Sequence, residues 1–267
     1  MTKVDLKTLV EIGAHFGHQA KRWNPKMEGF MHGIQDGVYV FDLIKTKELF
    51  DEALEYLTKA ASEGKHIVFL GTKKQAKDKV LEVAQNTGSM HVTERWLGGT
   101  FTNFDQIKAS IKKLAQMKED KKADAYADRT KKERVLIDRE IDRLERFFGG
   151  LAGLEAIPDV LIVIDTKKET GAVREAKATG VTVVGIVDSN ADPDVVDYPI
   201  PMNDDAKKSL DYALDLLGEA IMEGKKKPAG AKKTVKAKKA KTKTVGKKTV
   251  KARVKKVKNV ARVKSRK

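Results

Sequence analysis

Three things are scarce in this sequence, and each scarcity excludes a class of protein. None of the 267 residues is cysteine, which excludes disulfides and cysteine-based zinc sites and fits a reducing compartment. No segment approaches the roughly 18 apolar residues of a membrane-spanning helix, so we expect no membrane span. The first residues, Met1 to Asp5, are polar or charged for the most part and contain no apolar signal region. We therefore expect a cytoplasmic protein.

Acidic residues are absent from one end of the chain. Residues 225–267 contain 21 Lys+Arg and no Asp or Glu, whereas the whole chain has a formal net charge of +16. The remaining 224 residues hold 33 basic against 38 acidic side chains, a net charge of −5. This split predicts an α/β domain over residues 1–224 and a basic tail over residues 225–267.

The tail is of low complexity and has no aromatic residue. It repeats the sequence Lys-Lys-Thr-Val-Lys-Ala at residues 232–237 and 247–252. Such a segment buries too little apolar surface to offset the entropy lost on ordering, so we predict that it is disordered alone. Two roles stay open, an inert solvating tail or an arm that binds phosphates and releases counterions. The charge density specifies a polyanion but no sequence.

Short apolar runs alternate with helical patterns before the tail. Continuous β-branched runs are typical of strands buried on both faces. They occur at residues 66–70, 159–164 and 181–187, with weaker strand candidates at 90–93 and 196–201. Helices are predicted at residues 49–61, 74–86 and 169–179, with a short N-terminal helix from residue 6 and a β-hairpin over residues 29–42. This alternation predicts a parallel sheet covered by helices on both sides.

The region from about residue 104 to about residue 150 breaks the alternation. Two narrow apolar stripes there have helical spacing, with Ile107, Ile111 and Leu114 in the first and Ile137, Ile141, Leu144 and Phe148 in the second. A polar segment separates them, so we predict an inserted antiparallel helical hairpin, a short coiled coil. Lys108, Lys112 and Lys113 make its first helix a candidate RNA contact. The alternative is a purely structural arm.

Gly71-Thr72-Lys73-Lys74 lies where a predicted strand passes into a helix. Backbone amides and the helix dipole favour a phosphate at such a turn, and Lys73 and Lys74 add positive charge. The turn suits a nucleotide in an enzyme, an RNA phosphate in a binding protein, or no ligand at all. The usual phosphate-loop, dinucleotide-binding and nucleophile-elbow motifs are absent from the sequence.

Acidic and histidine side chains suggest a metal site, with a structural alternative in each case. Asp165 and Asp188 follow two predicted strands, where they either bind a metal or cap the next helix. His15 and His18 are three residues apart and would share one face of a helix. Together with Asp188 or Asp205 they would suit zinc. Hydrogen-bonded structural histidines are the default interpretation.

Two clusters are typical of nucleic-acid contacts. Lys21, Arg22, Trp23 and Lys26 place an aromatic ring among cations in a predicted loop. The second cluster, residues 95–103, combines cationic, hydroxyl and amide side chains with two glycines that let a backbone come close. Its candidate contacts are Arg95, Thr100, Thr102 and Asn103. Trp23 and Trp96 fit a core anchor as well as a stacking platform.

At these residues the chain resembles a known family, the bacterial second protein of the small ribosomal subunit. The resemblance runs from about residue 9 to about residue 223. It rests on Gly13-Ala14-His15-Phe16-Gly17-His18, Arg22-Trp23-Asn24-Pro25-Lys26-Met27, Phe69-Leu70-Gly71-Thr72-Lys73, the whole of residues 95–103, Pro158 to Asp165, Val187 to Asp194, and Ile200 to Ala206.

The resemblance implies a flavodoxin-like three-layer α/β/α fold with an inserted hairpin and no enzymatic activity. It implies contacts with small-subunit rRNA and with neighbouring proteins, including the large mRNA-binding protein one. By matching motif it implies that Lys21, Arg22, Trp23, Lys73, Arg95, Thr102 and Asn103 make or support such contacts. We therefore expect a structural protein of the 30S subunit, located on ribosomes in the cytoplasm. The alternatives are a nucleotide-dependent enzyme and a nucleoid-associated DNA-binding protein, and the long basic tail departs from the family pattern.

Overall fold

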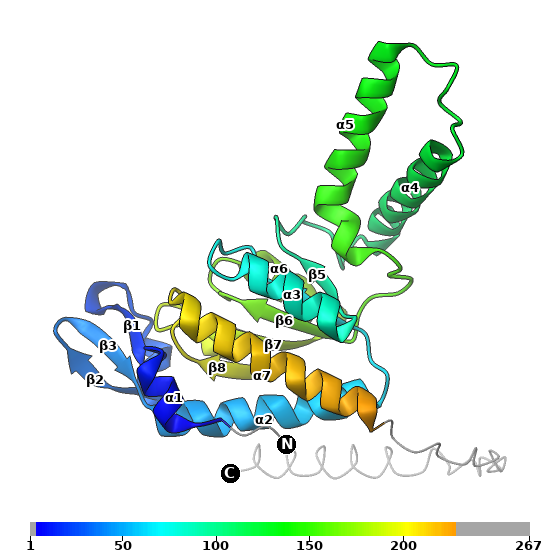
Figure 1. Ribbon diagram of the computed structural model, residues 1–267. Helices are drawn as coiled ribbons and strands as arrows, with labels where there is room; N and C mark the ends of the chain where they lie inside the picture. Colours follow the sequence, from blue (N-terminus) through cyan, green and yellow to red (C-terminus); the bar gives the residue numbers. More distant parts are fainter. Residues whose placement is uncertain (1–3, 228–267) are drawn as a thin grey trace, which may run out of the picture. The chain divides into compact units, whose positions relative to one another are not determined.

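The computed structural model describes residues 4–227, which build two β-sheets and the helices around them (Figure 1). The larger sheet has five parallel strands in the order β5-β4-β6-β7-β8. These are β4 (Ile67–Leu70), β5 (Met90–Val92), β6 (Val160–Ile164), β7 (Thr182–Val187) and β8 (Tyr198–Pro201). Counted along the chain, this order is 2-1-3-4-5, one of the common doubly wound orders. The predicted parallel sheet is confirmed.

Helices cover both faces of this sheet, because successive residues of each strand point to opposite sides. In β4, Ile67 and Phe69 join one hydrophobic core, and Val68 and Leu70 join the other. The first core also contains residues of α1 (Leu6–Glu11), α2 (Leu43–Ser62), α3 (Lys77–Thr87) and α7 (Lys207–Lys226). The second contains residues of α6 (Thr170–Thr179) and of the inserted helices. The result is a three-layer α/β/α arrangement.

Helix ends follow local chemistry. α3 and α6 end at Gly88 and Gly180, whose φ angles of 59° and 75° are left-handed and suit glycine. The predicted start of α3 is wrong by three residues, because residues 73–76 form a turn in which Ala76 N and Lys77 N donate to Lys73 O. α2 begins earlier than predicted, since the Asp42 side chain accepts a hydrogen bond from Ile44 N and caps the helix.

The smaller sheet is antiparallel and contains the predicted β-hairpin. Its strands are β1 (Phe16–Gln19), β2 (Met31–Gln35) and β3 (Val38–Phe41), in the order β1-β3-β2. Asp36 and Gly37 connect β2 to β3 with φ angles of 50° and 79°. Positive φ at both central residues gives the turn a twist that matches paired strands.

The inserted helices are α4 (Phe104–Lys122) and α5 (Lys131–Phe148), between β5 and β6. Residues of the two predicted apolar stripes are buried in one core, namely Ile107, Ile111, Leu114, Ile141, Leu144 and Phe148. Ion pairs join the helices at Lys113–Glu140 (3.1 Å) and Lys121–Asp138 (2.7 Å). A reciprocal capping box of Thr130 and Glu133 starts α5. The predicted helical insertion is therefore present.

The last helix extends past the predicted domain boundary. α7 continues through Lys226, and the Lys225 ammonium donates a hydrogen bond of 2.6 Å to the Thr87 carbonyl. Two residues that we assigned to the tail thus lie in a helix. The disorder that we predict for residues 228–267 lies outside the described residues. Across residues 4–227, each helix is too short or too polar to cross a lipid bilayer.

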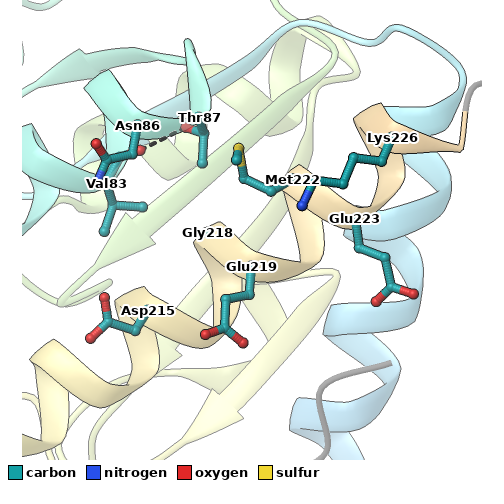
Figure 2. A pocket seen from close by; sticks show the side chains of 9 residues that line it. All are labelled: Val83, Asn86, Thr87, Asp215, Gly218, Glu219, Met222, Glu223 and Lys226. Carbon is teal, nitrogen blue, oxygen red and sulfur yellow. Dashed lines mark hydrogen bonds between the residues drawn. The ribbon is translucent and has the colours of Figure 1, made fainter.

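Two glycines let α7 approach its neighbours closely. A Cβ at Gly218 would lie 2.8 Å from Val83 Cγ1 of α3, and a Cβ at Gly224 would lie 2.2 Å from the Thr58 carbonyl oxygen of α2. Along the α3–α7 junction runs a groove of about 390 Å³, with Gly218 and Met222 on its α7 side (Figure 2). The α2–α7 contact at Gly224 is the closer of the two. It also involves a backbone atom, which cannot rotate away as a side chain can.

We expect Gly224→Ala to destabilise the protein through this contact. The added methyl group must displace backbone, and overpacking of this kind costs about 1–3 kcal/mol of unfolding free energy. Gly171→Ala is the matched control, because a Cβ at Gly171 in α6 meets nothing within 4 Å. Urea unfolding followed by circular dichroism measures both variants. Equal stability of Gly224→Ala and the wild type would contradict the packing described above.

Candidate nucleic-acid interface

The candidate residues gather at the carboxyl edge of the five-stranded sheet. β4 leads into Lys73, β6 into Asp165, β7 into Asp188, and β8 into Asp204 and Asp205. Parallel strands end at the same edge, where doubly wound sheets place their ligands. The segments that sequence analysis singled out separately therefore form one charged edge.

Lys73 lies at the centre of this edge and is held by three carboxylates. Its Nζ is 2.7 Å from Asp204 Oδ1, 2.7 Å from Asp205 Oδ1 and 3.2 Å from Asp165 Oδ2, and its side chain is only 14% exposed. Lys73 is therefore largely buried and paired, which suits a support for RNA contacts better than a direct contact. Its charge is taken up inside the protein, where it ties the ends of β4, β6 and β8 together.

Burial and ion pairing have opposite effects on the pKa values of the cluster. Burial alone would lower the pKa of Lys73, but Asp204, Asp205 and Asp165 outweigh it and raise that pKa. Burial raises the pKa of Asp204 to about 7, assisted by the charges of Asp188 and Asp165 and opposed by Lys73. The folded state thus favours a charged Lys73 ammonium group and a protonated Asp204 carboxyl group.

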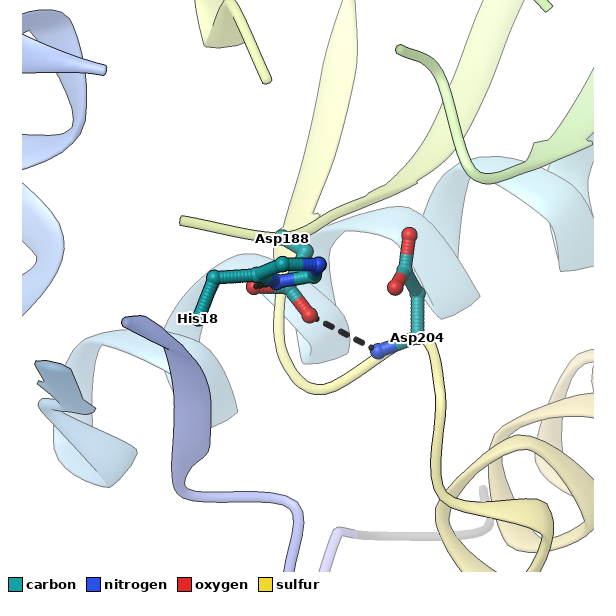
Figure 3. Close-up of side chains that lie close together, drawn as sticks. All are labelled: His18, Asp188 and Asp204. Carbon is teal, nitrogen blue, oxygen red and sulfur yellow. Dashed lines mark hydrogen bonds and ion pairs between the residues drawn. The ribbon is translucent and has the colours of Figure 1, made fainter. Parts of the chain in front are cut away.

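His18 joins the N-terminal sheet to the same cluster (Figure 3). Its Nδ1 is 2.9 Å from Asp188 Oδ1, and its Nε2 is 3.5 Å from Asp205 Oδ2. Its backbone NH donates to Ser189 Oγ at 2.7 Å, an approach that Gly17 permits because a Cβ there would lie 2.8 Å from the same oxygen. The hydrogen bond with Asp188 raises the pKa of His18, against the effect of burial.

The predicted metal candidates are only partly brought together. One possible ligand atom from each of His18, Asp188 and Asp204 lies within 4.8 Å of the others. Asp205 also borders His18, as predicted, whereas His15 is not part of this group. The two histidines do not lie on one helix, because the chain turns at Gly13 (φ 72°) and then enters β1, which contains His18.

Asp165 and Asp188 accept hydrogen bonds from loop backbone, but neither caps the next helix as the capping alternative predicted, because the N-caps of the following helices are Glu169 and Asp192. The Asp165 carboxylate accepts a hydrogen bond of 2.9 Å from Lys168 N in the turn before α6. The Asp188 carboxylate accepts from Ser189 N and, at 3.1 Å, from Asp204 N. These bonds hold the loops that follow β6, β7 and β8.

The first basic cluster packs beside this edge. Lys21 and Arg22 are exposed on a 3₁₀ turn (Ala20–Arg22), and the Trp23 ring stacks on Tyr39 with centroids 4.6 Å apart. Asn24 N donates to Ser189 O at 2.8 Å. Lys26 pairs with Asp192 (2.7 Å) and Asp194 (2.9 Å). Of this cluster, Lys21 and Arg22 present charge outward without an ion pair among the described residues.

The second cluster, residues 95–103, follows β5 at the same edge. Trp96 is buried and makes an edge-on contact with Phe101 at 4.8 Å, so it is a core anchor and no stacking platform. Thr100 is also buried, and its hydroxyl donates to Leu97 O at 2.6 Å. The RNA contact at Thr100 stays a prediction, and the inward-facing hydroxyl does not favour it.

The other candidate RNA contacts differ in how far their side chains are exposed to solvent. Lys74, Arg95, Thr102, Asn103 and Lys112 are exposed. In α4, Lys113 pairs with Glu140, and the Lys108 ammonium donates to Glu155 O at 2.6 Å. Two of the three lysines predicted to contact RNA from α4 thus also brace the insertion.

Glu175, in α6, organises the second cluster and is not among the residues predicted from the sequence. Its carboxylate accepts hydrogen bonds from Gly99 N (2.8 Å), Phe101 N (2.9 Å), Thr102 N (3.4 Å) and Trp96 Nε1 (3.3 Å). Burial would raise the pKa of Glu175, but these NH groups outweigh burial and lower it. No sequence signal pointed to it, because a glutamate inside a helix is usually a solvated surface residue.

Comparison with known proteins identifies the family to which these motifs belong. The family model described as ribosomal protein S2 matches residues 9–224.

The chain belongs to the ribosomal protein S2 family.

Its relatives include small ribosomal subunit proteins uS2 from three bacteria. The Coprothermobacter proteolyticus protein is 42% identical over 84% of each chain. The protein of Prochlorococcus marinus strain MIT 9515 is 42% identical over 85% of this chain and 97% of its own. The Petrotoga mobilis protein is 44% identical over 84% of this chain and 78% of its own. The S2 family is structural and not enzymatic, so the charged edge of this S2 chain is not an active site.

We expect the stability of this S2 chain to fall as pH rises from 6 to 8. His18 and Asp204 both have raised pKa values in the folded state, Asp204 to about 7. Stability from a raised pKa is complete below the unfolded value and is lost as pH rises through the folded value. His18→Gln should lower the unfolding free energy at pH 6 by about 1–3 kcal/mol and flatten the decline.

Urea unfolding at several pH values measures this effect. His66→Gln is the matched control, because His66 is exposed and its side chain makes no hydrogen bond within residues 4–227. A pH profile of His18→Gln as steep as that of the wild type would show that His18 does not titrate with folding.

Proposed function

We propose that this chain is a structural constituent of the small ribosomal subunit, where it binds small-subunit rRNA and neighbouring ribosomal proteins in support of translation. The observation that carries the proposal is the convergence of the family motifs on one sheet edge. Lys21, Arg22, Lys74 and Arg95 are exposed around that edge. The names of the relatives, small ribosomal subunit proteins, support the same role.

Binding in this proposal is electrostatic and geometric. The exposed cations contact RNA phosphates, which position a protein on folded RNA without reading its sequence. Thr102 and Asn103 are exposed beside Arg95 and reach phosphate or 2′-hydroxyl groups. Lys73 and Glu175 hold the loops from within, so the contact surface is rigid before RNA arrives.

The finer features of the proposal follow from the family resemblance. The fold is flavodoxin-like, and α4 and α5 form an antiparallel coiled coil that docks neighbouring RNA or protein. The protein partners include the large mRNA-binding protein one, and the location is the cytoplasmic ribosome. Structural histidines without a cofactor stay the prediction, and zinc at His15 and His18 with Asp188 or Asp205 stays the alternative.

The alternative is a nucleoid-associated DNA-binding protein with a polycationic tail. Under that alternative, the ordered cation surface of residues 4–227 has no purpose, because a tail alone compacts DNA by charge. Both alternatives bind polyanions, so a binding assay does not separate them. Location in the cell does.

We expect the chain to sediment with free small subunits and with whole ribosomes in a gradient of cell lysate at moderate salt. It should be present at one copy per small subunit, since a structural constituent occupies one site. Mass spectrometry of gradient fractions measures this ratio, with an established small-subunit protein as the internal standard. Recovery with the nucleoid, or in small amounts on few particles, would refute the proposal.

We further expect truncation after Lys227 to weaken the salt dependence of rRNA binding. Residues 228–267 carry 18 Lys+Arg and no acid. Each phosphate contact that is lost removes about 0.7–0.9 from the slope of log affinity against log salt. Filter binding to small-subunit rRNA at several salt concentrations gives the slope. An unchanged slope would show that the tail is an inert solvating segment.

A further inference from the structure

A second cavity opens at the carboxyl edge, apart from the Lys73 cluster. It has a volume of about 460 Å³ and lies between the segment after β4, the segment after β5 and the start of α6. Thr72, Arg95, Gly98, Lys168 and Glu169 are among the residues that line it. We call it the Arg95–Lys168 crevice.

The crevice lies where the direction of chain winding reverses. From β4 the chain continues through α3, which packs in the first core, and from β6 it continues through α6, which packs in the second. β4 and β6 are neighbours in the sheet, so their outgoing segments separate to opposite faces. In doubly wound sheets the opening at this point is where ligands bind.

Two cations that line the crevice have no carboxylate partner and are available to bind an anion. Its carboxylates have partners of their own, because Glu94 pairs with Lys77, Glu169 accepts from the Thr72 hydroxyl, and Glu175 accepts NH groups. Arg95 and Lys168 are exposed, and neither pairs with a carboxylate within residues 4–227. The Lys168 ammonium donates to the Thr72 carbonyl at 3.2 Å, which keeps it at the crevice.

We propose that the Arg95–Lys168 crevice binds a phosphate–ribose unit of the rRNA backbone. Arg95 and Lys168 contact the phosphate, and the N-terminal turn of α6 adds the positive end of its dipole. Gly98 leaves room for the backbone, since a Cβ there meets nothing within 4 Å. This inference rests on the proposed function, and it adds a specific RNA subsite that includes Lys168.

Glu175 is the positioning residue of this subsite. Its carboxylate fixes Gly99, Phe101 and Thr102 through their backbone NH groups, and this holds the Arg95–Asn103 segment at the crevice. An acid beneath a phosphate site is electrostatically unfavourable to RNA. Replacing Glu175 by glutamine therefore distinguishes its charge from its positioning role. Loss of the negative charge alone predicts tighter RNA binding, whereas loss of positioning predicts weaker RNA binding.

The first test is the double variant Arg95→Gln/Lys168→Gln in the full chain, measured by filter binding to small-subunit rRNA at several salt concentrations. Loss of the contact with this one phosphate should reduce the slope of log affinity against log salt by about 0.7–0.9. Lys7→Gln/Lys59→Gln is the matched control, since both lysines are exposed on α1 and α2, which pack in the other core. An equal slope change in both double variants would refute the subsite.

The second test compares Glu175→Gln with Glu94→Gln, each of which removes one negative charge from the crevice lining. Glu175→Gln should weaken rRNA binding roughly tenfold, the effect of losing one or two good hydrogen bonds. Glu94→Gln should bind as tightly as the wild type or more tightly. Amide hydrogen exchange at Gly99 and Phe101 should quicken in Glu175→Gln alone.

Tighter binding by Glu175→Gln would overturn the positioning role. Should Glu175→Gln fail to fold, the Arg95→Gln/Lys168→Gln pair decides, because both side chains are exposed. An unchanged salt slope for that pair in a chain that still sediments with small subunits refutes the crevice and leaves the proposed function standing. A wild-type chain that does not bind small-subunit rRNA refutes both.

Discussion

One ammonium group surrounded by carboxylates sets the geometry of the charged edge of the five-stranded sheet. Lys73 Nζ lies within 3.2 Å of oxygens from Asp165, which follows β6, and from Asp204 and Asp205, which follow β8. Without it, the buried acids would repel one another and the segments after β4, β6 and β8 would separate. His18 then attaches the N-terminal sheet through Asp188. The loops of the interface hold their shape because this network closes.

Different charged residues support the loops and face the solvent. The charges that hold the loops, Lys73 and Glu175, are partly buried and have their partners inside the protein. The charges that face outward, such as Arg22 and Arg95, lack carboxylate partners among residues 4–227. A domain with a net charge of −5 thereby keeps exposed cations without carboxylate partners, which the proposed RNA contacts require. This arrangement explains how an S2 chain suits RNA binding without being basic throughout its domain.

Local patterns predicted the architecture well because they depend on near neighbours in sequence. Continuous β-branched runs gave the parallel strands, glycines gave the ends of α3 and α6, and spaced apolar residues gave α4 and α5. The residues of the candidate RNA interface were harder to predict from the sequence. Lys73, Thr100 and Trp96 have residue types that suit RNA contact, yet the fold turns all three inward, toward partners as distant in sequence as Asp204.

The sequence alone therefore determined the α/β class, the inserted helices, the basic tail and the family, all of which follow from periodicity, composition and ordered motifs. Only the tertiary structure decided which charges are free. Charge availability depends on the distance to a partner, and partners such as Glu175 and Gly99, 76 residues apart, meet only when the parallel strands align their ends. A residue's type gives its chemistry, but the packing of distant segments decides whether that chemistry faces the protein or its ligand.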